Sequence, residues 1–349
     1  MTAIPPVPNA LQDAISKLAH HRPLSGVDAT EAFGVIMRGE ASAIQISAML
    51  AGLRVRGETS EIVAGVVRAL REVMVRLPAD NPDELVDTCG TGGGTVTTFN
   101  ISTAAALLAA GAGVRIAKHG NRSFTSRSGS ADVLEALGIS VEMSLETMQH
   151  TLATAGIVFM YAPAMHPAMR HVGPIRRELG IPTVMNIVGP LANPAGASRQ
   201  VVGVADRQRV PILAGALLEL ESIHAMVVHG EPGLDEISPL GITHVVEIRN
   251  GEMTDWELDP AEYGLRFDDA AELAGGSPQT NAAIVTEVLS GNGTATARAA
   301  VILNAGAAIY LSGRERTFKA GVESARGALD SGAGIGALER LRAACTGSA

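Results

Sequence analysis

Three short stretches of this sequence concentrate residues that can hold a polyanion and a hard metal ion. The first, DTCGTGGGTVTTFNIST at 87–103, carries Gly90, Gly92, Gly93 and Gly94 ahead of a run of hydroxyl side chains. Glycine lets backbone N–H groups approach an anion closely, and the N-terminus of a following helix favours negative charge. A tight strand-to-helix turn with hydroxyl caps would explain the same residues, so this stretch alone leaves both interpretations open.

The second stretch, KHGNRSFTSRSGSAD at 118–132, combines cations with hydroxyls. Lys118, Arg122 and Arg127 stand in a chain whose net charge is -9, so their density is unusual. Cations and hydroxyls together are what a polyanionic ligand needs, and Asn121 adds a side-chain amide. A solvated basic loop is the alternative, and we favour phosphate binding.

The third stretch, HGEPGLDEISP at 229–239, places Asp235 and Glu236 side by side in a loop bracketed by glycine and proline. Carboxylate oxygens bind Mg²⁺, usually together with substrate phosphates, and adjacent acids can face two ions that share one pyrophosphate. An isolated Asp-Glu pair is more often an ordinary acidic surface loop. The two anion-binding candidates earlier in the chain favour the metal interpretation here.

A fourth stretch, MHPAMRHVGPIRRELGIPT at 165–183, contains His166 and Arg176 among prolines. Arg176 could clamp a carboxylate in bidentate fashion. From spacing alone, a surface helix with salt-bridged arginines explains these residues better.

The elements that must position these stretches fall into two groups. The first 80 residues predict helices only, and Asp28 with Glu31 forms a capping-box pattern that starts a helix ending near Gly39. Beyond residue 85, short apolar runs alternate with helical stretches, which is typical of an α/β domain. We expect strands at 84–89, 114–120, 157–163, 200–205, 224–230 and 244–251.

The predicted fold class is therefore α/β, with a central, largely parallel sheet flanked by helices and a small N-terminal helical domain. Residues 165–196 hold no clear strand and are expected to pack near the N-terminal helices. The predicted domains are a helical domain at 1–80, with a contribution from about 165–196, and an α/β domain at 81–349.

Composition narrows the function classes. A sequence pI near 5.5 argues against a nucleic-acid partner, which would favour a basic surface. Cys89 and Cys345 are too few for a disulfide framework and fit a reducing cytoplasm. We find no signal-peptide pattern and no convincing membrane span, so we expect a cytoplasmic protein without a membrane partner.

Taken together, these stretches resemble the anthranilate phosphoribosyltransferases of tryptophan biosynthesis. The resemblance covers nearly the whole chain and includes, in order, the glycine loop with NIST, KHGNRS with SGSADVLEALG, MHPAM with IRRELGIPT, and LDE. It implies that the α/β domain binds phosphoribosyl pyrophosphate (PRPP) and that the smaller helical domain closes over it. The helical domain would also form the contact of a homodimer.

The resemblance also assigns roles by position. The residues implied to bind PRPP are Gly90, Gly93, Gly94, Thr98, Asn100, Ile101, Ser102, Thr103, Lys118, His119, Gly120, Asn121, Arg122, Ser123, Phe124, Thr125, Ser126 and Ser130. Those implied to contact anthranilate are Gly90, His119, Asn121, His166, Arg176 and Gly189. Mg²⁺, about two ions per subunit, is implied at Ser102, Asp235 and Glu236.

One position departs from the family pattern. The family's glycine loop reads Gly-Thr-Gly-Gly-Asp, whereas this chain has Gly94 at the last position. The backbone role of the loop is intact, but a carboxylate beside the pyrophosphate is missing. We therefore expect a changed dependence on Mg²⁺.

The implied reaction moves the phosphoribosyl group of PRPP to the amine of anthranilate and releases pyrophosphate. That amine is largely unprotonated at neutral pH, so we expect charge stabilisation by Lys118 and metal ions in place of a single acid or base. Two alternatives stay open: a pyrimidine nucleoside phosphorylase-like enzyme, and a non-enzymatic member of the same fold that binds nucleic acid. Asn121, Arg176 and the acidic pI favour the transferase.

Overall fold

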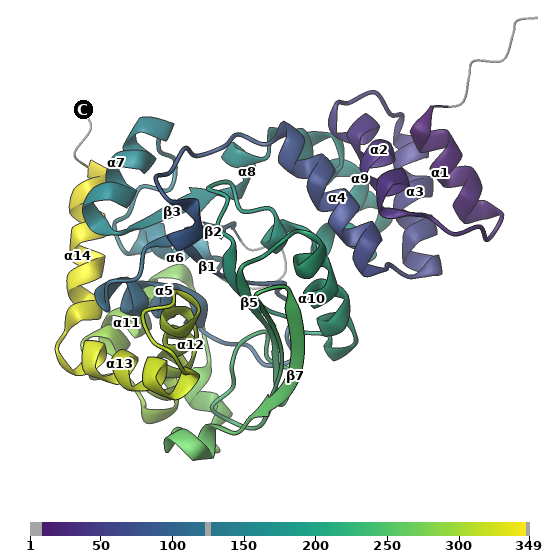
Figure 1. The fold of residues 1–349 in the computed structure, drawn as a ribbon. Coiled ribbons are helices and arrows are strands. Elements are labelled where there is room, and N and C mark those ends of the chain that lie inside the picture. Colours follow the sequence, from purple (N-terminus) through teal and green to yellow (C-terminus); the bar gives the residue numbers. More distant parts are fainter. Residues whose placement is uncertain (1–8, 123–126, 347–349) are drawn as a thin grey trace, which may run out of the picture. The chain divides into compact units, whose positions relative to one another are not determined.

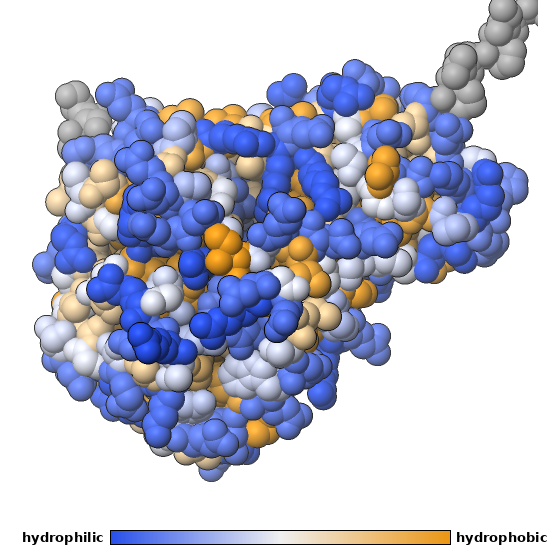
Figure 2. All heavy atoms as spheres, viewed as in Figure 1, coloured by the Kyte–Doolittle hydropathy of each residue, from blue (hydrophilic) through white to orange (hydrophobic). Residues whose placement is uncertain are grey.

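The computed structural model describes residues 9–122 and 127–346 (Figure 1). The chain divides into two compact units, Met1–Val75 with His166–Ala192, and Arg76–Met165 with Asn193–Ala349. Within the described ranges, no helix has the length and apolar character needed to cross a membrane. Hydrophilic residues cover most of the face drawn in Figure 2, with hydrophobic residues scattered between them.

The first unit is helical. Its N-terminal helices are α1 (Ala10–Ala19), α2 (Gly26–Met37), α3 (Ala43–Arg56) and α4 (Ser60–Val73). The later segment adds α9 (Gly173–Leu179) and three short 3-10 helices, η2 (Pro167–His171), η3 (Val184–Asn186) and η4 (Gly189–Leu191). Helix α9 packs on α3, and η2 packs on α2. This segment therefore belongs to the helical core although it lies far from α4 along the chain.

The predicted start of α2 at Asp28 is wrong. Ser25 is the N-cap residue, because its hydroxyl accepts a hydrogen bond from the Asp28 N–H at 3.1 Å. The Asp28 carboxylate in turn accepts from the Ser25 N–H at 3.0 Å. Asp28 is thus the acidic third residue of a capping box that begins at Ser25, ahead of the position that the sequence pattern indicated.

The second unit is built on a seven-stranded sheet with the order β3-β2-β1-β4-β5-β6-β7. Its strands are β1 (Val86–Gly90), β2 (Ile116–Gly120), β3 (Ile157–Tyr161), β4 (Arg199–Gly203), β5 (His224–Gly230), β6 (Thr243–Arg249) and β7 (Glu252–Leu258). Strands β1 to β5 pair in parallel, and β6 and β7 extend the sheet in antiparallel fashion. The largely parallel sheet and the α/β class are confirmed.

Helices pack on this sheet and on one another. They are α5 (Ile101–Gly111), α6 (Ser130–Ala136), α7 (Leu145–Ala155), α8 (Ala162–Met165), α10 (Val210–Glu219), α11 (Pro278–Leu289), α12 (Ala295–Leu311), α13 (Phe318–Asp330) and α14 (Ala333–Thr346). Short 3-10 helices are η1 (Pro82–Glu84), η5 (Arg207–Arg209), η6 (Pro260–Tyr263) and η7 (Ala270–Leu273). Helices α5 and α12 pack on β1, and α10 packs on β5. Consecutive residues of β5 are buried, as expected for a parallel strand covered on both faces.

The three candidate stretches meet at one edge of the sheet. The glycine loop follows the carboxyl end of β1 at Gly90, and the basic stretch begins within β2 and runs past its end at Gly120. The acidic loop follows β5 at Gly230. Because these strands are parallel, their carboxyl ends share an edge, which is where open α/β sheets bind ligands.

Candidate active site

The glycine loop is hydrogen-bonded to the acidic loop. The Gly92 N–H donates to Asp235 Oδ2 at 2.8 Å. Gly92 and Gly93 have φ angles of +71° and +83°, a left-handed conformation that favours glycine. A Cβ at Gly94 would lie 2.9 Å from the Gly233 carbonyl oxygen, so a side chain there requires the acidic loop to shift. The Asp235 carboxylate therefore accepts a hydrogen bond from one of the backbone N–H groups that were predicted to bind an anion.

Asp235 and Glu236 are half-buried and close to the N-terminus of α5. Glu236 Oε1 accepts a hydrogen bond from the Ser102 N–H at 3.1 Å. Burial raises the pKa of Asp235, and burial together with the Asp235 charge raises the pKa of Glu236 to about 8. Both shifts have burial as their largest cause, so holding two negative charges here is costly in the absence of a bound metal ion.

Lys118 is the cation next to this pair. Its Nζ donates to the Thr88 carbonyl and, at 3.2 Å, to Ser102 Oγ. Burial lowers the pKa of Lys118, while the charges of Asp87 and Glu236 act in the opposite direction. Lys118 is 3% exposed, so it can act on a bound anion mainly through its field and through Ser102.

A buried network that the sequence analysis missed lies close enough to this lysine for the Asp87 charge to act on it. Asp87 is fully buried, and its carboxylate accepts from Asn193 Nδ2 at 2.8 Å and from the His119 N–H at 3.1 Å. Asn193 Nδ2 also donates to the Ala117 carbonyl at 2.9 Å. Burial raises the pKa of Asp87 to about 6. The one signal in the sequence is a charged residue inside an apolar strand, since Asn193 lies far away along the chain.

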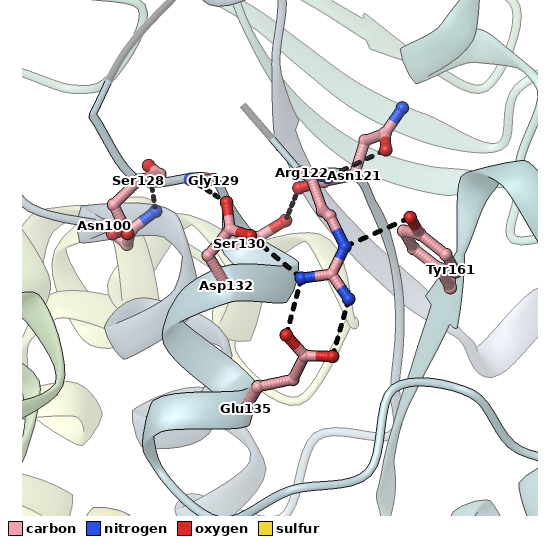
Figure 3. A network of polar contacts seen from close by, with 9 residues as sticks. All are labelled: Asn100, Asn121, Arg122, Ser128, Gly129, Ser130, Asp132, Glu135 and Tyr161. Carbon is pink, nitrogen blue, oxygen red and sulfur yellow. Dashed lines mark hydrogen bonds and ion pairs between the residues drawn. The ribbon is translucent and has the colours of Figure 1, made fainter. Parts of the chain in front are cut away.

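The basic stretch is described at 118–122 and 127–132, and the predicted ligands Ser123, Phe124, Thr125 and Ser126 lie outside the described residues. A Cβ at Gly120 would clash with Ser130 Oγ and the Phe159 ring, so β2 must end in glycine. Ser130 Oγ donates to the Asn121 carbonyl at 3.2 Å. The Arg122 guanidinium lies against acids of α6, as Figure 3 shows, and its contact with phosphate stays a prediction.

The start of α5 supplies the remaining predicted PRPP residues. Asn100 Oδ1 accepts from Asn281 Nδ2 at 2.9 Å, and Asn100 Nδ2 donates to the Ser128 carbonyl at 3.3 Å. The side chains of Ile101 and Thr103 are buried, so only the backbone of these two residues can face a ligand. Thr98 is half-buried in the loop before α5. The Asn281 contact was not predicted, because α11 is distant in sequence.

Comparisons with known proteins agree with this arrangement. Residues 82–335 match the glycosyl transferase family, a/b domain, and residues 12–74 match the helical bundle domain of that family. The chain is 48% identical to an anthranilate phosphoribosyltransferase of Rubrobacter xylanophilus over 95% of its own length and 96% of the relative. It is 46% identical to anthranilate phosphoribosyltransferase 2 of Streptomyces coelicolor, covering 91% of this chain and 95% of that one.

This chain belongs to the anthranilate phosphoribosyltransferase family. Solved structures of the family share its fold: the Thermus thermophilus enzyme has a TM-score of 0.90 and 41% identity, covering 95% of this chain and 99% of that one. The Saccharomyces cerevisiae enzyme in complex with PRPP and Mg has a TM-score of 0.86 and 30% identity, covering 97% and 98%.

The acidic loop of this chain suits Mg²⁺. In the described ranges, no group of three or more His, Cys, Asp or Glu side chains is arranged to hold a metal ion by itself. The donors present are the carboxylates of Asp235 and Glu236 and the Ser102 hydroxyl. Mg²⁺ is commonly held by one or two carboxylates and completed by substrate phosphates, so this donor set and its raised pKa values fit the ion.

The predicted anthranilate residues are divided between the two units. Gly90, His119 and Asn121 lie in the α/β unit, whereas His166, Arg176 and Gly189 lie in the helical unit. Burial lowers the pKa of Arg176, whose guanidinium donates to Asn186 Oδ1 at 3.4 Å and forms no ion pair within the described residues. Burial also lowers the pKa of His166 to about 4, which keeps its ring neutral at pH 7.

Proposed function

We propose that this chain transfers the phosphoribosyl group of PRPP to the amine of anthranilate, giving N-(5-phosphoribosyl)anthranilate and pyrophosphate for tryptophan biosynthesis. The observation that carries the proposal is the meeting of the glycine, basic and acidic loops at one sheet edge in a chain of this family. The yeast relative solved with PRPP and Mg supports the same substrate and metal ion.

The PRPP side of the reaction depends on charge. The glycine loop offers backbone N–H groups, Lys118 supplies a positive field, and Ser102 connects the lysine to Glu236. Two Mg²⁺ ions at Ser102, Asp235 and Glu236, when bound, would neutralise the leaving pyrophosphate. No described side chain near this edge is required as a proton acceptor, because the aromatic amine attacks in its neutral form.

Arg176 is the residue we assign to the carboxylate of anthranilate. It is a half-buried guanidinium without an acidic partner in the described residues, so a bound carboxylate would supply the missing counter-charge. His166 is buried in the same unit and neutral at pH 7, and we assign its uncharged ring to the aromatic acceptor. We assign the open side of Gly189, where a Cβ would meet nothing within 4 Å, to the same acceptor.

The helical unit carries a surface suited to a homodimer contact. Ile44 is 81% exposed and Val55 is 85% exposed on α3, and Ala48 and Ala51 lie between them at helical spacing. An apolar stripe left open to water favours association with a second copy.

Cys89 and Cys345 form no disulfide with each other, which is compatible with a protein that functions in a reducing cytoplasm.

A fluorescence assay of anthranilate consumption with PRPP and Mg²⁺ tests the proposal. Arg176→Ala should raise the KM for anthranilate by about tenfold or more and change the KM for PRPP little, because it removes a charged contact to one substrate. Arg177→Ala, at the exposed neighbouring position, is the matched control and should leave both values near those of the wild type. Equal changes in both KM values for Arg176→Ala would place the acceptor site elsewhere.

A further inference from the structure

Arg122 follows Asn121 just after β2, and its guanidinium is hydrogen-bonded to acidic residues of α6. Its two terminal nitrogens donate to Glu135 Oε1 and Oε2, each at 2.6 Å. One of them also donates to Asp132 Oδ1 at 3.0 Å, and Nε donates to the Tyr161 hydroxyl at 3.3 Å. The guanidinium carbon lies 5.6 Å from the centre of the Tyr161 ring (Figure 3).

These contacts make the Arg122 side chain a poor candidate for direct phosphate binding. Two carboxylates against one guanidinium leave a local excess of negative charge, which repels a polyanion. The paired hydrogen bonds to Glu135 have the planar fork geometry that arginine and carboxylate favour. The hydrogen bond to Glu135 is the largest cause of a raised Arg122 pKa. A phosphate would have to displace Glu135 to reach this side chain.

The backbone of Arg122 makes a separate contact, with the side chain of Asn121. Its N–H donates to Asn121 Oδ1 at 2.7 Å. Because a backbone N–H can only donate, the side-chain oxygen of Asn121 must be the atom that faces it. The Asn121 carbonyl is held separately by the Ser130 hydroxyl and the Ala131 N–H, both at 3.2 Å. Figure 3 shows the amide nitrogen of Asn121 pointing away from Arg122.

We propose that Arg122 is a positioning residue that acts through Asn121, with Glu135 as its anchor. The clamp to α6 holds the Arg122 N–H on Asn121 Oδ1, so that Asn121 presents its NH₂ group, a donor, to an oxygen atom of the substrate. The ligand chemistry selected at this position is an oxygen acceptor, such as a carboxylate or phosphate oxygen. This inference rests on the proposed function, which places Asn121 in the substrate site.

Two variants, one that changes the local charge and one that conserves it, test the clamp. Glu135→Gln removes a negative charge, and Arg122→Lys keeps the positive charge, yet both break the paired hydrogen bonds. If Arg122 acts by positioning, both variants should raise the KM of the substrate whose oxygen Asn121 contacts, anthranilate or PRPP, by about tenfold, the effect of one lost hydrogen bond to a ligand. In an Asn121→Ala background neither change should raise it further, since the two residues would act through the missing amide.

Direct phosphate binding by the Arg122 side chain predicts a different pattern. Glu135→Gln would then free the guanidinium and lower the KM for PRPP, and that result would overturn the clamp. Unchanged KM values in both variants would overturn it as well. Glu135 is exposed on α6, so its replacement by glutamine should leave the fold intact, which a thermal unfolding scan checks.

A measurement without substrate separates this inference from the proposed function. Amide hydrogen exchange at Arg122, followed by NMR in the ligand-free chain, reports its hydrogen bond to Asn121 Oδ1. Glu135→Gln should speed exchange at Arg122 by about tenfold while residues of β5 exchange as before. Unchanged exchange would contradict the clamp even if anthranilate is the substrate, and faster exchange would support it even if anthranilate is not.

Discussion

Replacing Asp235 with alanine should raise the affinity of the metal-free protein for pyrophosphate, although Asp235 is an expected metal ligand. Asp235 Oδ2 accepts the Gly92 N–H at 2.8 Å. A Cβ at Gly90 would clash with the same oxygen, so the Asp235 carboxylate fills the space over the glycine loop. An anion that enters the nest without a cation must displace this carboxylate and meet its charge.

The size of the effect follows from that one contact. A hydrogen bond to a charged group contributes about 1.5–3 kcal/mol, which corresponds to roughly 10–100-fold in affinity. Gly92 is exposed, so water weakens the contact and the lower end, about tenfold, is the expected gain. Asp235→Asn removes the charge but keeps an oxygen acceptor for the Gly92 N–H, so its gain should be smaller.

Isothermal titration with pyrophosphate in the presence of a chelator measures the affinity of the metal-free protein for pyrophosphate. The titration is then repeated with Mg²⁺. The wild type should bind more tightly with Mg²⁺, whereas Asp235→Ala should lose much of that increase. Glu236→Gln, at the neighbouring acid, is the control that leaves the contact between the Gly92 N–H and Asp235 in place, and it should change metal-free binding less. Weaker metal-free binding by Asp235→Ala than by the wild type would refute the reasoning.

Three further predictions concern metal dependence, pH and assembly. Gly94→Asp adds a carboxylate whose Cβ would lie 3.6 Å from Asp235 Oδ1. The variant should therefore unfold at a lower temperature than the wild type without Mg²⁺, and Mg²⁺ should raise its unfolding temperature more. An equal rise for both proteins in a thermal scan would contradict this. The pKa of Asp87 is raised to about 6 from 3.8, so the native state retains a proton that the unfolded chain loses. The contribution of Asp87 to the free energy of unfolding should therefore fall by about 3 kcal/mol as pH rises from about 4 to about 6, and urea titrations of the wild type and Asp87→Asn should differ by this slope. Ile44→Glu should shift the protein toward a monomer in analytical ultracentrifugation, and an unchanged mass would rule out the α3 stripe as the contact.

The strands buried on both faces were predictable because their apolar runs are continuous, as in HAMVVHG of β5. Strand β7 was not predicted, because its residues from Glu252 to Asp255 are exposed at the sheet edge and follow no apolar run. The anion loops were recognisable because glycine, cations and hydroxyls cluster within each one.

Contacts between residues that lie far apart along the chain could not be predicted from the sequence. Asn193 reaches Asp87 across 106 positions, and the Gly92 N–H meets Asp235 across 143. The ion pairs of Arg122 in the basic stretch were not predicted either. The acids that bind its side chain, Asp132 and Glu135, lie in the helix that follows the loop and look like ordinary helix residues in the sequence.

The most direct test of the account measures anthranilate consumption and pyrophosphate release together with the wild-type chain. With PRPP, Mg²⁺ and anthranilate, the fluorescence of anthranilate should fall while one pyrophosphate appears for each anthranilate consumed, and omission of PRPP should stop both. Phosphate-dependent cleavage of pyrimidine nucleosides, with anthranilate left unchanged, would contradict the proposed function and favour the phosphorylase alternative.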